Sequence, residues 1–161
     1  MTMERKMRRI RQLLPEEETK QILKKCTNGV LSLIDKDGMP YGVPMSFVYD
    51  GDMTIYFHCA VAGHKIECIG DGCHCSFCVV GQDEIIAEKF TTYFSSAIVF
   101  GNISVVNGEE NVVKALRLIC EKYSPGIDSE NEILRNLRIV KILRLDIERI
   151  TGKKSIELIN Q

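Results

Sequence analysis

The sequence predicts a mainly β fold of the α+β class, with antiparallel strands and helices at its periphery. Two turn signals, Asp35–Gly38 and Asp50–Asp52, separate three short apolar runs within fewer than 30 residues. A longer run rich in β-branched residues follows at 93–106. Six such runs along the chain indicate a small antiparallel β-barrel, either closed or split.

Two residues inside the expected strands predict how the sheet is built. Proline cannot donate to a sheet ladder, so Pro44 requires an edge strand or a bulge. Gly101 lies midway along a long strand and predicts a bulge or a bend. The strands that we expect cover residues 30–34, 41–49, 53–58, 75–80, 93–106 and 139–150.

The expected helices follow from their start and stop signals. Pro15 suits a first helical turn, and the carboxylates of Glu16–Glu18 favour the positive end of the helix dipole. Asn28-Gly29 predicts the end of this helix. Apolar spacing predicts three further helices, at 62–69, 112–122 and 130–137.

Length and charge narrow the class of protein. The chain has 161 residues, which suits a single domain over 1–161 with a basic N-terminal arm at about 1–12. Its 21 basic and 22 acidic side chains give a net charge of −1, which does not favour a nucleic-acid partner. The arm lacks interleaved aromatic residues for base stacking, so we expect it to be solvated; its cations are Arg5, Lys6, Arg8, Arg9 and Arg11.

Hydropathy and cysteine content bear on the compartment. No apolar run approaches the roughly 20 residues that a membrane helix needs. The basic start is not followed by the apolar segment of a secretory signal. We therefore expect a cytoplasmic protein without a membrane partner, whose seven cysteines are thiols rather than disulfides.

The run Cys73–Cys78 has ligand types that suit zinc, namely thiolates and the imidazole of His74. A structural zinc site usually takes four ligands from two separated clusters, and the remaining cysteines are dispersed at 26, 59, 68 and 120. In a strand, Cys75 and Phe77 share one face while Ser76 and Cys78 share the other. We expect small buried apolar side chains here and no metal.

The segment Phe57–Lys65 contains a strand end followed by a glycine-containing helix start. Free backbone N–H groups at a helix start attract anions, and Lys65 with His64 adds charge or donors, so a phosphate cradle is one reading. A merely solvated lysine is the other. A Cys–His nucleophile is disfavoured, because His58 and Cys59 are adjacent strand residues that point to opposite faces.

Two serines interrupt the apolar run at 93–97. Ser95 and Ser96 are either ordinary outward-facing strand positions or the lining of a pocket for a polar ring. The residues themselves do not decide between these two interpretations.

Taken in order, several segments resemble the Nim-type (nitroimidazole-resistance) branch of the pyridoxamine-phosphate-oxidase-like flavoproteins. Most specific are a G-x-P-Y-x-V-P combination over 38–44 and an F-H-x-A-x-x-G-H-K combination over 57–65. The resemblance spans nearly the whole chain. The other matching segments are Met7-Arg8-Arg9, 63–66, 95–101 and 150–153.

The resemblance implies a six-stranded FMN-binding split barrel that forms a homodimer with flavin sites at the interface. It implies that residues 43–46 bind the flavin ring through backbone groups, that 58 and 59 flank the ring or ribityl chain, that 64 and 65 hold the phosphate, and that 95 and 96 face the flavin, from the other subunit. The implied cofactor-binding residues are Val43, Pro44, Met45, Ser46, Phe57, His58, Cys59, Ala60, His64, Lys65, Ser95 and Ser96.

The function that the resemblance implies is an FMN-dependent oxidoreductase, a reductase of nitroaromatic or nitroimidazole compounds. His58 is the candidate for contact with substrate or ring. The segments that bind pyridoxal phosphate in the related oxidases have no match, so we do not expect vitamin B6 oxidation. The alternative is a non-catalytic flavin- or haem-binding module of the same fold, with His58, His64 or His74 as haem ligands.

Overall fold

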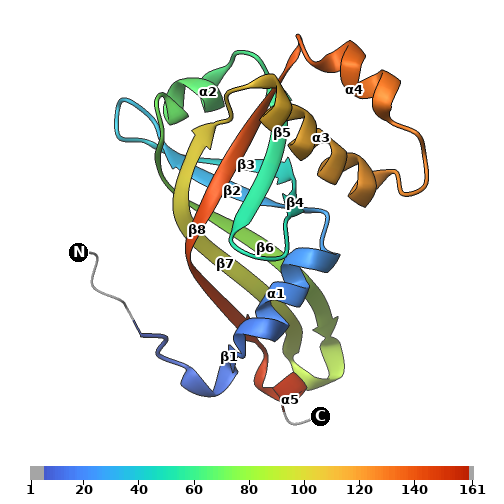
Figure 1. Cartoon of the computed structure of the whole chain (residues 1–161). Helices are drawn as coiled ribbons and strands as arrows, with labels where there is room; N and C mark the ends of the chain where they lie inside the picture. Colours follow the sequence, from blue (N-terminus) through green and yellow to red (C-terminus); the bar gives the residue numbers. More distant parts are fainter. Residues whose placement is uncertain (1–5, 160–161) are drawn as a thin grey trace.

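A computed structural model describes residues 6–159, and its centre is one antiparallel sheet (Figure 1). The strands follow the order β3-β2-β6-β7-β8-β5-β4, and β1 pairs with β8. The six longer strands correspond to the six that the sequence predicts. The strands are β1 (Leu13–Leu14), β2 (Asn28–Ile34), β3 (Pro40–Ser46), β4 (Val48–Tyr49), β5 (Thr54–Ala60), β6 (Cys73–Ile86), β7 (Thr91–Val105) and β8 (Val140–Lys154).

The predicted helices are present, with shifted ends. None of the described helices has the length and apolarity to span a bilayer. Arg5 of the expected basic arm lies outside the described residues, and the arm continues into a short 3₁₀-helix at Ile10–Gln12. The helices are α1 (Glu16–Lys25), α2 (His64–Ile69), α3 (Glu109–Tyr123), α4 (Glu130–Asn136) and α5 (Ile156–Ile159), with a second 3₁₀-helix at Ala87–Lys89.

The predicted end of the first helix is wrong. Helix α1 begins directly after Pro15, as expected, but it ends at Lys25, and Asn28-Gly29 starts strand β2. A Cβ at Gly29 would lie 2.6 Å from the Phe77 ring and 2.6 Å from the Cys78 carbonyl oxygen. The glycine therefore serves the close approach of β2 to β6 rather than a helix cap.

The predicted strand over 41–49 is two strands, because the chain changes edges of the sheet at Phe47. Strand β3 is one end of the strand order and β4 is the other. Pro44 lies on the edge strand β3, which confirms the expectation drawn from its missing N–H. The two ends of the sheet are thus joined covalently over a single residue.

The sheet curls around a core, and its two edges approach without closing. The ring of Phe77 lies 4.9 Å from that of Phe47 and 5.0 Å from that of Phe57, both edge to face. In the described chain no hydrogen-bonded ladder joins β3 to β5, so the barrel is split. This confirms the predicted fold class. The core also contains Leu23, Leu31, Leu33, Ile55, Val79, Val99, Ile103, Leu143 and Leu145.

Helix α3 covers the outer face of the β4–β5–β8 end of the sheet, and α4 packs against α3 (Figure 1). This second apolar cluster explains why Ile142 is fully buried although it points away from the barrel interior. Its buried members are Val48, Ala115, Leu116, Ile119, Ile133 and Ile142.

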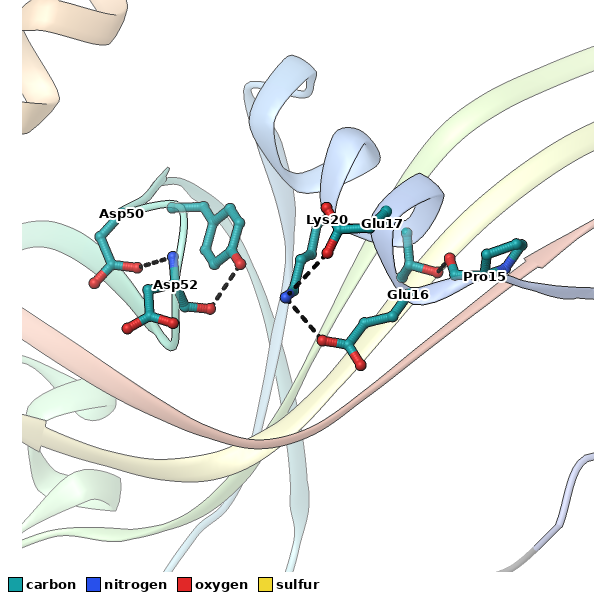
Figure 2. Close-up of polar contacts among 8 residues, drawn as sticks. Pro15, Glu16, Glu17, Lys20, Asp50 and Asp52 are labelled. Carbon is teal, nitrogen blue, oxygen red and sulfur yellow. Dashed lines mark hydrogen bonds and ion pairs between the residues drawn. The ribbon is translucent and has the colours of Figure 1, made fainter.

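Polar contacts lie within the start of helix α1 and, separately, within the neighbouring β4–β5 turn (Figure 2). The Lys20 ammonium lies 2.8 Å from a Glu16 carboxylate oxygen and 3.5 Å from one of Glu17. In the turn beside it, the Asp52 N–H donates to the Asp50 carboxylate at 2.9 Å. Solvent screens ion pairs of this kind, so they contribute little to the stability of the fold.

Strand β6 is much longer than the predicted 75–80. The prediction stops too early because residues 81–86 lack the apolar alternation that would indicate a strand. They pair with the first residues of β7 to extend a hairpin, past a register shift between Val80 and Gln82. Gly101 sits at a second register shift, between β7 and β8, which confirms the predicted bulge. A Cβ there would collide with the Asp146 carbonyl oxygen.

The Gly101→Ala substitution should lower the free energy of unfolding by about 2 kcal/mol or more, because the clash is with backbone that cannot rotate away. Gly42→Ala is the matched control, since the added Cβ meets nothing nearer than a Val30 methyl group at 3.4 Å. Urea unfolding followed by circular dichroism measures both. Equal losses in the two variants would contradict the assigned role of Gly101.

Candidate functional site

The split in the barrel leaves two strand edges facing each other. Strand β5 pairs with β4 only through Ile55 and Tyr56, so the edge of β5 beyond Tyr56 has no partner strand among the described residues. Opposite it runs β3, which pairs only with β2. Edge strands present unpaired N–H and C=O groups. The split therefore offers backbone donors and acceptors from both sides.

A pocket of about 370 Å³ occupies this part of the split. The structure brings together seven of the predicted cofactor-binding residues, from β3, β5 and the start of α2. It adds two residues at the start of β8 that sequence reasoning missed. The lining residues are Pro44, Met45, Ser46, His58, Cys59, Ala60 and Lys65, with Ile139 and Val140 as the additions.

Lys65 contributes the charge in this pocket. Its ammonium lies 3.1 Å from the Met45 thioether sulfur, which is a weak acceptor. The salt bridges found between residues 6 and 159 all involve other cations. Lys65 is thus a half-buried cation without a carboxylate partner in the described chain, which suits an anionic ligand.

A second lysine lies close to the same wall. Lys141 on β8 is the register partner of Cys59 on β5, and both side chains are half-buried. Burial raises the pKa of the Cys59 thiol, while the charges of Lys65 and Lys141 lower it. Both lysines therefore act electrostatically on one point of the pocket wall, and burial outweighs them, which leaves Cys59 a thiol rather than a nucleophilic thiolate.

His64 does not line the pocket. Its ring packs edge to face on Tyr41 at 4.6 Å, with Nε2 3.7 Å from the Cys68 sulfur and Nδ1 3.8 Å from a Glu67 carboxylate oxygen. These contacts orient the imidazole toward Tyr41, Cys68 and Glu67. Lys65, one residue later, turns toward Met45 instead.

The other predicted residues lie outside the pocket. Val43 packs against the barrel core, and the Phe57 side chain is fully buried in it, so only their backbone groups are near the split. Ser95 lines a different pocket, of about 490 Å³, beside helix α1. Ser96 faces outward on β7, opposite Val80 and Lys153. Within one chain, the two serines do not meet the residues of the split.

The missed residues Ile139 and Val140 carry no local signal. They reach the pocket because β8 pairs with β5 in a register that places Val140 opposite Ala60. A contact made through pairing between strands 80 residues apart in sequence depends on the tertiary fold.

An exposed apolar surface borders the pocket on the outer face of the sheet. One row across five strands contains Pro44, Val30, Cys78, Ile98 and Thr151. Pro44 belongs to both the row and the pocket lining. We call this the outer-face patch; its large apolar members are Val30 (41% exposed), Val80 (60%), Ile98 (38%) and Phe100 (38%). Patches of this kind mark interaction surfaces.

The cysteine run on β6 follows the strand alternation predicted from its sequence. Cys75 and Phe77 are buried in the barrel, while Ser76 and Cys78 lie on the outer face. Among the described residues, no group of three His, Cys, Asp or Glu side chains comes together as a metal site would require. Burial raises the pKa of the Cys75 thiol to about 12, which marks it as an inert packing residue.

The fold and the pocket in its split define the class of β-barrel to which the pyridoxamine-phosphate oxidases belong. Residues 15–154 match the family described as pyridoxamine 5'-phosphate oxidase, and the chain belongs to that family. The family resemblance expected from the sequence motifs is thereby confirmed. A search among curated protein sequences found no match.

Solved structures share the fold. A candidate 5-nitroimidazole antibiotic resistance protein from Bacteroides thetaiotaomicron is 22% identical, with a TM-score of 0.78 over 88% of this chain and 86% of that chain. The flavocytochrome Anf3 from Azotobacter vinelandii is 18% identical, with a TM-score of 0.77 over 96% and 74%. The FAD and heme binding protein from Mycobacterium smegmatis is 18% identical, with a TM-score of 0.73 over 88% and 71%. At these identities the likeness shows a common fold.

Stability should fall at alkaline pH, in part through Cys75. A thiol whose pKa is raised from 9.0 to about 12 on folding stays protonated in the folded chain while the unfolded chain ionises. Its contribution is complete below about pH 9 and is lost as pH rises toward 12, with a slope of up to about 1.4 kcal/mol per pH unit.

Urea unfolding under reducing conditions, repeated between pH 8 and 11, measures this loss. The Cys75→Ala variant lacks the thiol, so the gap in unfolding free energy between wild type and variant should narrow as the pH rises. Parallel curves for the two proteins would contradict the assignment.

Proposed function

We propose that the chain binds flavin mononucleotide in the pocket of the split. One observation supports this most. The open strand edges of β3 and β5 lie at the same pocket as Lys65, which has no carboxylate partner among the described residues. A flavin ring system carries alternating donors and acceptors along one edge, which matches backbone groups on β3 and β5. A phosphate at the other end of the cofactor matches the Lys65 ammonium.

In this proposal the residues of the split hold different parts of the cofactor. Residues 43–46 bind the ring through backbone groups, and His58 with Cys59 flanks the ring or the ribityl chain. Lys65 contacts the phosphate, and Lys141, the register partner of Cys59, adds to the positive potential there. His64 steadies the start of α2 through Tyr41 rather than touching the phosphate.

We propose an oxidoreductase that reduces small electrophilic compounds, with nitroaromatic compounds as the class to test first. The bound flavin supplies the electron transfer, and the protein supplies binding and orientation. His58 is exposed and lines the pocket, so it is the side chain placed to touch a substrate or the ring. The buried Met45 and the half-buried Cys59 supply the less polar part of the pocket wall.

Haem is the second candidate group, because two structures of the same fold are named as a flavocytochrome and as an FAD and heme binding protein. The histidines favour flavin. His58 alone of the three lines the pocket, while His64 packs on Tyr41 and His74 is exposed on β6. An absorbance spectrum of the purified protein separates flavin bands from a Soret band, and chromatography of the released group separates FMN from FAD.

The assembly that we propose is a twofold homodimer formed through the outer-face patch. The patch is apolar, it is not covered by the helices of the described chain, and it borders the pocket at Pro44. A second copy seated on it would wall the open side of the pocket. Ser96 lies on the same face, so the partner's copy of this residue is placed to approach the cofactor.

Lys65→Ala should weaken FMN binding by about ten- to a hundredfold, because a charge-assisted hydrogen bond contributes about 1.5–3 kcal/mol. Riboflavin has no phosphate, so its dissociation constant should change little. Fluorescence titration with both ligands measures the contrast. Lys36→Ala, in the exposed turn before β3, is the matched control and should leave both constants unchanged. Equal losses for FMN and riboflavin in Lys65→Ala would sink the phosphate assignment.

Ile98→Glu should convert a dimer to a monomer and lower flavin affinity, because it places a charge at the centre of the outer-face patch. Light scattering coupled to size-exclusion chromatography measures the mass. Ile127→Glu, at an equally apolar exposed position after α3, should leave the dimer intact. A wild-type monomer that binds flavin with full affinity would overturn the dimer proposal.

A further inference from the structure

The C-terminal end of α3 reaches the point where the chain crosses the split. Phe47 is the single residue between β3 and β4. The Tyr123 hydroxyl accepts the Phe47 N–H at 3.0 Å and lies 2.7 Å from the Phe47 carbonyl oxygen and 2.6 Å from that of Thr27. Both backbone groups of the crossover residue are therefore held by one side chain from a distant helix.

Lys122 also binds the backbone of Phe47. Its ammonium donates to the Phe47 carbonyl oxygen at 2.9 Å and to the Cys26 carbonyl oxygen at 2.6 Å, and it lies 4.1 Å from the centre of the Phe47 ring. Burial lowers the pKa of this ammonium. The two hydrogen bonds to carbonyl oxygens offset part of the cost of drawing this ammonium out of water.

The clamped residue adjoins the pocket. The peptide group that joins Ser46 to Phe47 contains the N–H bound by Tyr123, and Ser46 with Met45 lines the β3 side of the split. Because β3 has no partner on that side, no sheet ladder sets its distance from β5. The hydrogen bonds of Lys122 and Tyr123 instead hold the chain directly after the end of β3.

We propose that Lys122 and Tyr123 are positioning residues of the cofactor site, which place the β3 wall against the flavin ring without touching the cofactor. This inference rests on the proposed flavin function. It differs from the role of Lys65, because a displaced ring wall affects every flavin, whether or not the ligand carries a phosphate. It also differs from simple structural support, because the environment of the bound ring changes with the wall.

The experiment uses the full-length protein and compares Lys122→Met and Tyr123→Phe with two matched controls. Lys114→Met removes an exposed lysine from the same helix, and Tyr93→Phe removes a hydroxyl that accepts a hydrogen bond from Lys89. For each variant we measure the dissociation constants of FMN and riboflavin, the visible absorption band of the bound flavin, and its reduction potential. Lys122→Arg tests whether a conservative cation restores the site.

We expect Lys122→Met and Tyr123→Phe to weaken FMN and riboflavin equally, by about tenfold, since each loses hydrogen bonds to the wall. The absorption band and the potential of the flavin that still binds should shift, Lys122→Arg should recover part of the affinity, and both controls should match wild type. If Lys122→Met does not fold, the same measurements on Tyr123→Phe and Lys122→Arg test the inference.

Two results would overturn the inference. Variants that are less stable, yet bind flavin with wild-type affinity, band and potential, would reduce the clamp to structural support and leave the proposed function intact. A wild-type protein that binds neither FMN nor riboflavin would overturn the proposed function and this inference together.

Discussion

The structure depends on a sheet whose two ends are joined through Phe47 and yet are not hydrogen-bonded to each other. The strand order runs from β3 to β4, and a single residue connects them. Crossing from one edge to the other interrupts the ladder, so the backbone groups of Phe47 need other partners. Lys122 and Tyr123 supply them, while the Phe47 ring anchors the crossover in the core against Phe77.

The same constraint creates the site. A closed barrel would pair β3 with β5 and consume the backbone groups that now face the pocket. The split leaves those groups free, and the start of α2 places Lys65 above them. Rigid strands on both sides hold the pocket lining in place, which suits a flat ligand that must be oriented rather than enclosed. The outer-face patch meets this site at Pro44, so the proposed flavin site and the proposed dimer interface share one border.

Local patterns account for much of what was predicted correctly. Pro44 lacks a donor and could lie only on an edge strand or at a bulge, and a glycine midway along a strand, such as Gly101, indicates a bulge or a bend. The predictions of element ends failed where the residues are compatible with two kinds of local structure. Gly29 is as suitable for a close strand approach as for a helix end, and the polar residues 81–86 extend β6 without an apolar alternation.

The sequence by itself predicted the class of fold and six of its strands, because periodicity and turn chemistry are local properties, and the family resemblance of its motifs implied seven residues that line the pocket. The tertiary structure alone decided that His64 packs on Tyr41, that Ile139 and Val140 reach the pocket, and that Lys122 and Tyr123 bind the crossover. These contacts join segments far apart in the chain or select one rotamer among several. Such choices are set by pairing register and packing, which no local pattern encodes.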